Sequence, residues 1–174
     1  MGRSNGPPGY NKVIHMGVFY TRPELVAARA QWRKAGKTVV FTNGCYDILH
    51  PGHIRLLERA RSLGDILILA LNTDDSVARL KGPSRPLLAE TERARMALAL
   101  AAVDAVTFFG EDTPRELIAE VLPDVLIKGA DWAHFIAGRE EVEAAGGKVM
   151  ALALEPGFST TNIEKELLAR QPLP

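Results

Sequence analysis

The sequence predicts an α/β protein in which one parallel β-sheet is doubly wound by helices. Short apolar runs alternate along the chain with segments whose apolar residues recur at helical spacing. One run, ILILAL at 66–71, is wholly apolar, as expected of a parallel strand that is buried on both faces. Strands separated by helices imply right-handed βαβ crossovers, so the strands should form a parallel sheet with helices on both sides.

The first half of the chain shows this alternation from residue 21 onwards. Thr21 and Glu24 have the spacing of a capping box, Pro23 lies near the first helical position, and Gly36 ends the helical pattern. The patterns that follow predict a strand at 38–42, a helix at 54–63, a strand at 66–71 and a short helix around residues 77–80.

The second half continues in the same way, and we find no internal repeat, low-complexity tract or second domain. It predicts helices at 93–102, 114–122, 140–145 and 161–170, and strands at 105–109, 124–128 and 148–154. Together these elements indicate a single Rossmann-like domain over residues 16–174. Residues 1–15 are rich in Gly, Pro and Asn, and we interpret them as a flexible extension or a remnant of the expression vector.

The composition is that of an ordinary soluble globular protein. Of the 174 residues, 47% are hydrophobic and 24% are charged, which suits one domain with a substantial core. Lys plus Arg and Asp plus Glu each number 21, so no basic excess points to nucleic acid or to an anionic membrane. With no apolar stretch long enough to cross a bilayer and no secretory signal, we expect a cytoplasmic protein. The single cysteine, Cys45, excludes an intrachain disulfide.

The segment FTNGCYDILHPGH at 41–53 gives the strongest indication of function. An apolar strand stops at the turn-forming pair 43–44, a loop follows, and a helical pattern begins after His53. Free backbone N–H groups and the helix dipole at such a start can hold phosphate. His50 and His53, three residues apart, are predicted to face the same anion. The alternative is that both histidines only cap and pack; the preceding strand and loop favour a nucleotide-phosphate site.

Each polar cluster of interest directly follows a predicted strand. The clusters run from Thr42 to Asp47, Asn72 to Asp75, Lys128 to Asp131 and Glu155 to Thr161. In doubly wound sheets, ligands bind at the carboxyl ends of the strands, near the point where the strand order reverses. We therefore expect these clusters to form one shared site.

Two motifs resemble those of a known enzyme superfamily. The segment FTNGCYDILHPGHIRLLERARSLGD resembles the signature of the cytidylyltransferase-like nucleotidyltransferases, and the residues STTNI at 159–163 resemble their second motif. Within the superfamily, three further segments are similar to the heptose 1-phosphate adenylyltransferases, which occur alone or as one half of a bifunctional heptose kinase. These segments are LNTDDSVARLKGPSRP, VDAVTFFGEDTPRELIAEVLPDVLIKGADW and PGFSTTNI.

This resemblance implies an activity and a set of small-molecule partners. The family transfers AMP from ATP to a sugar 1-phosphate, here D-glycero-β-D-manno-heptose 1-phosphate, and releases pyrophosphate. The product, ADP-heptose, would serve the synthesis of the lipopolysaccharide core. The resemblance also implies Mg²⁺ bound mainly by the nucleotide phosphates, and a homodimer, with no nucleic-acid or membrane partner.

The chemistry requires positioned donors rather than a covalent nucleophile. Attack of a phosphate oxygen on the α-phosphorus builds negative charge on the phosphoryl oxygens and on the leaving pyrophosphate. We assign catalytic roles to His50, His53 and Lys81, and expect Cys45 to line the loop rather than attack. Residues expected to bind nucleotide or substrate are Thr42, Asn43, Gly44, Tyr46, Asp47, Gly52, Asn72, Arg85, Lys128, Gly129, Asp131, Ser159, Thr160 and Thr161. No protein ligand of the metal is predicted.

Several of these residues also have a purely structural interpretation. A lysine such as Lys81 is usually a solvated surface residue, but the resemblance to the family's post-strand loop favours phosphate contact. Arg93 reaches the site or pairs on the helix surface with Glu90 or Glu92. Asp47 suits the orientation of the loop or of a histidine better than it suits metal binding.

The remaining candidates combine structural and binding roles. Asp74 and Asp75 cap the short helix, or one of them holds sugar hydroxyls. One residue of 159–161 is expected to N-cap the last helix, which is compatible with binding the β- and γ-phosphates. Gly129 allows a base or ribose to approach the backbone closely, and Trp132 packs on the substrate or in the core.

Other activities remain open at this level. A cytidylyltransferase acting on glycerol 3-phosphate or a related alcohol phosphate is the nearest alternative, but those enzymes usually carry an arginine before Gly-Ile-Ser-Thr-Thr that the stretch 154–161 lacks. Pantetheine-phosphate and nicotinamide-mononucleotide adenylyltransferases share only the first motif. A non-catalytic nucleotide sensor is disfavoured by the intact His50, His53 and Lys81.

Overall fold

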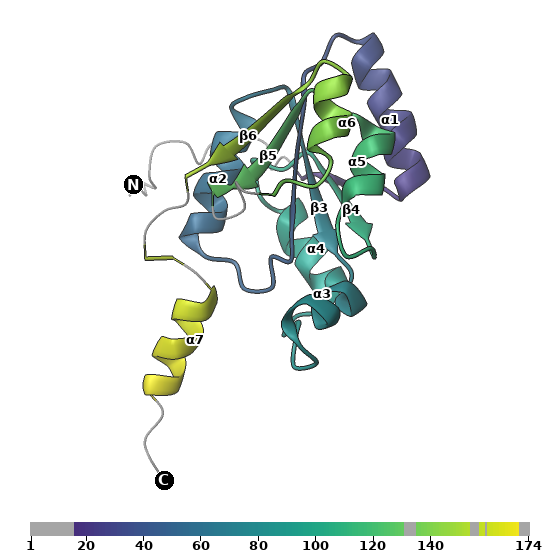
Figure 1. The fold of residues 1–174 in the computed structure, drawn as a ribbon. Helices are drawn as coiled ribbons and strands as arrows, with labels where there is room; N and C mark the ends of the chain where they lie inside the picture. Colours follow the sequence, from purple (N-terminus) through teal and green to yellow (C-terminus); the bar gives the residue numbers. More distant parts are fainter. Residues whose placement is uncertain (1–15, 131–134, 154–156, 159, 171–174) are drawn as a thin grey trace, which may run out of the picture.

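The protein is built on a six-stranded, wholly parallel β-sheet (Figure 1). The computed structural model describes residues 16–130, 135–153, 157–158 and 160–170. The sheet order is β1-β4-β3-β2-β5-β6. The strands are β1 (Val18–Phe19), β2 (Val39–Gly44), β3 (Ile66–Asn72), β4 (Ala105–Phe109), β5 (Val125–Gly129) and β6 (Lys148–Leu152). The predicted α/β, doubly wound parallel architecture is confirmed.

Helices cover both faces of the sheet, and one helix stands apart from it (Figure 1). The helices are α1 (Arg22–Lys34), α2 (Pro51–Arg61), α3 (Asp74–Lys81), α4 (Glu90–Leu98), α5 (Arg115–Val121), α6 (Arg139–Ala144) and α7 (Thr160–Ala169). α2 and α4 pack on one face, whereas α1, α5 and α6 pack on the other. Helix α7, yellow in Figure 1, lies away from the sheet beyond the start of α2.

The central strand β3 shows why both faces need helical cover. Leu67, Leu69 and Leu71 point into the core under α2 and α4, and the intervening Ile68 and Ala70 point into the core under α1 and α5. All five are fully buried. Burying one such leucine or isoleucine stabilises the fold by roughly 1.5–3 kcal/mol, so a strand apolar at every position suits only the middle of a two-sided sheet.

Element boundaries differ from the sequence prediction in several places. β1 was not predicted, because only two exposed residues at the sheet edge form it, in parallel with β4. β2 continues through Gly44 instead of ending at residue 42, since Asn43 and Gly44 pair in register with β3. α4 spans Glu90–Leu98 rather than 93–102. The capping box of α1, formed by Thr21 and Glu24, is present as predicted.

The reversal of strand order lies between β2 and β5. From β2 the chain moves outward through β3 to β4, then returns across the sheet to add β5 and β6 on the other side. Ligands of doubly wound sheets bind at the carboxyl edge next to such a reversal. Here that edge carries Asn43 and Gly44 from β2 and Lys128 and Gly129 from β5. No helix in the described part of the chain has the length and apolar character needed to span a membrane.

Candidate active site

The start of α2 brings the two motif histidines together. His50 is the N-cap residue, and its Nδ1 accepts a hydrogen bond of 3.3 Å from the backbone N–H of His53. The two rings stack with centroids 3.7 Å apart and an angle of 18° between their planes. Gly52 leaves room for this arrangement, because a Cβ there would lie 3.0 Å from Nδ1 of His50. With Nδ1 accepting, a neutral His50 carries its proton on Nε2, which leaves that N–H for another partner.

His53 lies between His50 and Tyr46. The Tyr46 ring centroid is 4.6 Å from that of His53, at an interplanar angle of 39°. Burial lowers the pKa of His53 to about 4, and the charges of His50 and Lys81 act in the same direction, against a smaller opposing effect of the Ile48 carbonyl. His53 is therefore a neutral imidazole at pH 7, with one ring nitrogen as a donor and the other as an acceptor.

Tyr46 supports the histidine pair from a strained backbone position. Its φ angle of 49° lies in the left-handed region, and its side chain is buried and hydrogen-bonded to that of Thr42. Gly44 must lack a side chain, since a Cβ there would come within 2.9 Å of the Tyr46 ring. The resulting contacts fix the ring against which His53 packs, so Thr42, Gly44 and Tyr46 shape the site from behind.

Asp47 fastens the motif loop to a second loop at 82–88. Its carboxylate accepts hydrogen bonds from Arg85 at 2.7 Å and from the backbone N–H groups of Leu87 and Leu88 at 2.8 and 3.0 Å. The Asp47 side chain is 3% exposed. Burial alone would raise the pKa of Asp47, but these N–H donors and the Arg85 charge outweigh it, so the pKa lies below its ordinary value. Of the roles considered for Asp47, orientation of a loop is the one the structure shows.

Arg93 is buried and joins three segments of the site. Its guanidinium donates to the Cys45 carbonyl at 2.8 Å, to the Leu88 carbonyl at 3.0 Å and to the Asp74 carboxylate at 2.7 Å. Of the two alternatives for Arg93, surface pairing with Glu90 or Glu92 is wrong, because Arg93 lies on the inward face of α4. Glu90 instead accepts from the backbone N–H of Asp74 at 2.8 Å.

The start of α3 is capped by a residue that the sequence analysis did not consider. Thr73 is the N-cap, and its Oγ1 accepts from the backbone N–H of Ser76. Asp74 and Asp75 instead lie in the first turn, where their negative charges interact favourably with the helix dipole and stabilise the helix. The capping role proposed for the two aspartates belongs to Thr73. The carboxylate of Asp74 pairs with Arg93 instead.

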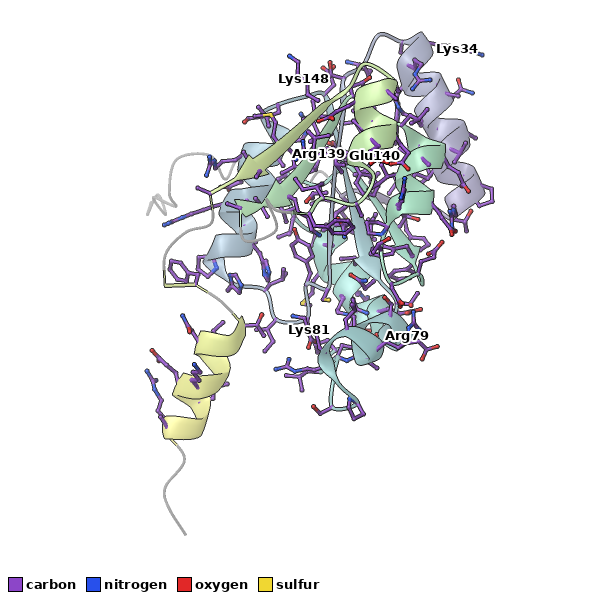
Figure 2. The ribbon with its side chains drawn as sticks, viewed as in Figure 1. Lys34, Arg79, Lys81, Arg139, Glu140 and Lys148 are labelled. Carbon is purple, nitrogen blue, oxygen red and sulfur yellow. The ribbon has the colours of Figure 1, made fainter. Side chains whose placement is uncertain are left out.

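Lys81, at the end of α3, lies close to the motif loop. Its charge lowers the pKa of both His53 and Cys45, which places the ammonium group near the two side chains. Figure 2 shows Lys81 at the end of the molecule opposite Lys34. Burial is the larger influence on Cys45 and raises the pKa of its thiol, so the residue stays protonated at pH 7. A protonated, half-buried thiol suits the lining role expected for Cys45.

The carboxyl ends of β2, β3 and β5 meet at the reversal of strand order. Lys128 donates from Nζ to the Asn43 carbonyl at 3.2 Å and to its Oδ1 at 3.0 Å. The buried Asn72 donates to the hydroxyl of Ser76 at 2.9 Å, and its Oδ1 lies 3.8 Å from Sγ of Cys45. These contacts gather three of the predicted polar clusters at one edge of the sheet.

Some predicted site residues lie outside the described part of the chain. These are Asp131, Trp132, Ser159 and the stretch 154–156. Thr160 opens α7, and Thr161 follows it in the same helix. Near them, Phe158 approaches α2: its ring lies 5.8 Å from the Arg55 guanidinium, and a Cβ on Gly52 would lie 3.1 Å from its Cβ.

Comparison with known proteins places this geometry in a family. The family model described as cytidylyltransferase-like matches residues 41–166, which include the histidine loop, Lys81, Lys128 and most of α7. The chain belongs to the cytidylyltransferase-like family. This assignment confirms the prediction of a nucleotidyltransferase domain.

The curated relatives are larger proteins than this chain. "Bifunctional protein HldE" of Syntrophotalea carbinolica is 53% identical over 139 residues, which cover 79% of this chain and 28% of the relative. The protein of the same name from Koribacter versatilis is 53% identical over 144 residues, covering 82% of this chain and 30% of the relative. The chain thus spans less than a third of the length of these relatives.

Two solved structures share the fold. The lipopolysaccharide core biosynthesis protein from Thermoplasma volcanium superposes with a TM-score of 0.57 at 30% identity, over 69% of this chain and 98% of that chain. Pantoate-beta-alanine ligase from Francisella tularensis superposes with a TM-score of 0.60 over 89% of this chain and 80% of that chain. Its identity is 14%, so the second likeness concerns the fold alone.

In this cytidylyltransferase-like domain the carboxyl edge is suited to an anionic ligand. The nearby carboxylates of Asp47 and Asp74 are held by Arg85 and Arg93, so their negative charges are compensated. The start of α2 instead carries the imidazoles of His50 and His53, and the positive charge of Lys81 acts on His53 there. Such a set stabilises phosphate oxygens.

Replacing Asp47 with asparagine should destabilise the protein by about 2–4 kcal/mol, because Arg85 loses its buried counter-charge and the amide NH2 that replaces one carboxylate oxygen faces a donor instead of accepting from it. The depressed pKa adds a pH signature. Asp47 stabilises the wild type above its ordinary value near pH 4, and this contribution is lost as the pH falls through the lower folded pKa. Urea unfolding between pH 2.5 and 7 measures both effects. Equal destabilisation by Glu58→Gln, on an exposed face of α2, would contradict the assignment.

Proposed function

We propose that the protein is an adenylyltransferase that transfers AMP from ATP to D-glycero-β-D-manno-heptose 1-phosphate, giving ADP-heptose and pyrophosphate. The observation that carries the proposal is the stacked His50–His53 pair at the start of α2, with Lys81 beside it. The choice of sugar rests on the similarity to HldE proteins at 53% identity. A match to under a third of a bifunctional protein fits the expectation that this domain corresponds to one of its two halves.

The side chains supply positioning and charge stabilisation. The triphosphate lies over the start of α2, where backbone N–H groups and the N–H donors of His50 and His53 contact the oxygens of the α-phosphate and the leaving pyrophosphate. Lys81 compensates the growing charge. The acceptor phosphate oxygen forms the new P–O bond as the bond to pyrophosphate breaks, so the protein forms no covalent intermediate. The protonated Cys45 has no part in this step.

Mg²⁺ fits this arrangement as a companion of the nucleotide. The carboxylates beside the histidine loop are engaged by Arg85 and Arg93, and the remaining groups are cationic or neutral donors that suit phosphate. The metal would therefore be held by phosphate oxygens and water, which is its usual mode in such sites. Bound there, it would neutralise charge on the leaving pyrophosphate.

We further propose a cytoplasmic homodimer whose product feeds lipopolysaccharide synthesis. The edge strand β1 offers an apolar surface to a second copy, since Val18 and Phe19 are both exposed there. Light scattering on purified protein measures the oligomeric state, and a monomer at micromolar concentration would contradict this part of the proposal.

Pyrophosphate release tests the proposed function directly. The purified protein is incubated with Mg²⁺ and either ATP or CTP, in the presence of heptose 1-phosphate or of glycerol 3-phosphate. We expect release only with ATP and heptose 1-phosphate. Release with CTP and glycerol 3-phosphate would replace the proposal with the cytidylyltransferase alternative. Tight ATP binding without release from any pair would identify a nucleotide sensor instead.

Replacing Lys81 with methionine should lower kcat/KM for ATP by at least about tenfold, because a charge-assisted hydrogen bond to phosphate is worth roughly 1.5–3 kcal/mol. The matched control is Lys34→Met, at the exposed end of α1 and at the opposite end of the molecule (Figure 2). Steady-state kinetics of both variants measures the difference. Equal kcat/KM values for the two variants would show that Lys81 does not contact the phosphates of ATP.

A further inference from the structure

A pocket of about 100 Å³ opens at the carboxyl edge of the sheet, beside the histidine loop. Its polar lining comes from Asn43, Asn72 and Lys128 at the ends of three strands, with Asp112 and Thr113 in the loop after β4. Its apolar lining includes Leu80 of α3 and Phe135. The volume is that of several water molecules, which suits a hydroxylated group better than a large apolar one.

The pocket and the histidine pair lie on opposite sides of the sheet. Tyr46, against which His53 packs, belongs to the core under α2 and α4. Phe109 and Ile136, which line the pocket, belong to the core under α1, α5 and α6. Asn43, at the end of β2, contributes to the pocket and stands at the start of the histidine loop. The end of β2 therefore separates the two regions.

In-line phosphoryl transfer needs this kind of separation. The attacking oxygen and the leaving oxygen lie on opposite sides of the α-phosphorus. If pyrophosphate departs toward the start of α2, the acceptor approaches from the other side of the end of β2, where the pocket opens.

We propose that this pocket binds the hydroxylated sugar of the acceptor, an inference that rests on the proposed adenylyl transfer. The side chains of Asn43 and Thr113 hydrogen-bond to sugar hydroxyls, and Phe135 packs against a C–H face of the ring. Alternating amide or hydroxyl groups and apolar side chains match a pyranose, which presents hydroxyls at its rim and C–H groups on its faces. The pocket therefore selects a polyhydroxylated sugar 1-phosphate over a small alcohol phosphate.

Phe135 and Thr113 allow a test with little risk to the fold, since both side chains are exposed. Phe135→Ala and Thr113→Val should each raise KM for heptose 1-phosphate at least tenfold and leave KM for ATP within twofold. The matched control is Leu63→Ala, an exposed apolar residue after the end of α2, which should change neither KM. Thermal melts of all three variants establish that they fold.

The outcomes separate this inference from the proposed function. An inactive wild type would overturn the adenylyl transfer itself. An active wild type whose Phe135→Ala and Thr113→Val variants keep KM for the sugar phosphate within twofold would overturn the pocket assignment alone. If Phe135→Ala and Thr113→Val instead raise KM for ATP, the pocket binds nucleotide, and the assignment of the pocket to the sugar is overturned.

Discussion

Replacing His53 with alanine is expected to lower turnover at least about 100-fold while the protein stays folded. Loss of one donor aimed at a developing phosphoryl charge commonly costs a factor of this size. His53 stacks on His50 and Tyr46, so the variant also loses this packing and the interaction with the Ile48 carbonyl. Pyrophosphate release under saturating ATP and sugar phosphate measures the effect, with circular dichroism to establish the fold.

His53→Asn is the informative companion variant, because asparagine keeps an N–H donor. It should recover part of the activity that alanine loses. A well-folded His53→Ala protein with near wild-type turnover would refute the catalytic role. Equal and complete inactivity of both variants would indicate that imidazole geometry, rather than the presence of a donor, is required.

The low pKa of His53 also predicts how stability depends on pH. In the unfolded chain the imidazole takes up a proton near pH 6.5, whereas in the folded protein it does so only near pH 4. The unfolded state therefore binds more protons between these values, and stability rises with pH across this window and levels off above it. The difference is on the order of 2 kcal/mol for a partly exposed ring. Urea unfolding of wild type and His53→Asn from pH 4 to 8 tests this, and identical slopes would contradict it.

Phosphate binding should reverse this shift. An anion beside the ring favours the imidazolium form, so ATP is expected to raise the pKa of His53 toward its ordinary value. Proton NMR titration of the ring with and without ATP measures the change. Where no anion lies beside the rings, His50 and His53 should both be neutral, since two stacked imidazolium rings would repel each other.

The fold could be predicted from the sequence wherever a periodic pattern was long enough to read. The apolar run of β3 and the alternation of strands and helices predict a parallel sheet, because each helix must cover one of its faces. β1 could not be predicted in this way, since two exposed residues carry no period. Its position is set by pairing with β4, from which it is separated by more than 80 residues of sequence.

The site was predictable in its motif but not in its supporting contacts. His50, His53 and Gly52 lie within one short segment, so the helix start alone places them. The hydrogen bond between Arg85 and Asp47 joins residues 38 positions apart, and no local sequence pattern predicts it. The pocket likewise combines side chains from strands and loops that meet only after folding. One available signal was overlooked: Arg93 shares the apolar stripe of α4 with Ala97 and therefore faces inward.

Replacing Arg93 with methionine is expected to destabilise the protein by about 3 kcal/mol and to impair catalysis as well. Arg93 is 1% exposed, and its three hydrogen bonds satisfy the carbonyls of Cys45 and Leu88 and the carboxylate of Asp74. Without it, two carbonyls lose a donor, although the partly exposed Asp74 regains water. Urea unfolding measures the stability change, and Arg95→Met, exposed on the same helix, is the control.

Kinetics distinguishes a positioning role of Arg93 from a merely structural one. The guanidinium ties the histidine loop, through Cys45, to the loop that follows Lys81, through Leu88. If Arg93 in this way keeps the two histidines and Lys81 correctly placed around one phosphate, its loss should affect turnover more than ATP binding. Arg93→Met should then lower kcat more than it raises KM for ATP, at a temperature where the variant is folded. Arg93→Lys keeps the charge but cannot reach all three acceptors, so it should recover stability better than turnover. Full activity in a folded but destabilised Arg93→Met protein would show that Arg93 has only a structural role. The two histidines and Lys81 would then be correctly placed without the Arg93 guanidinium.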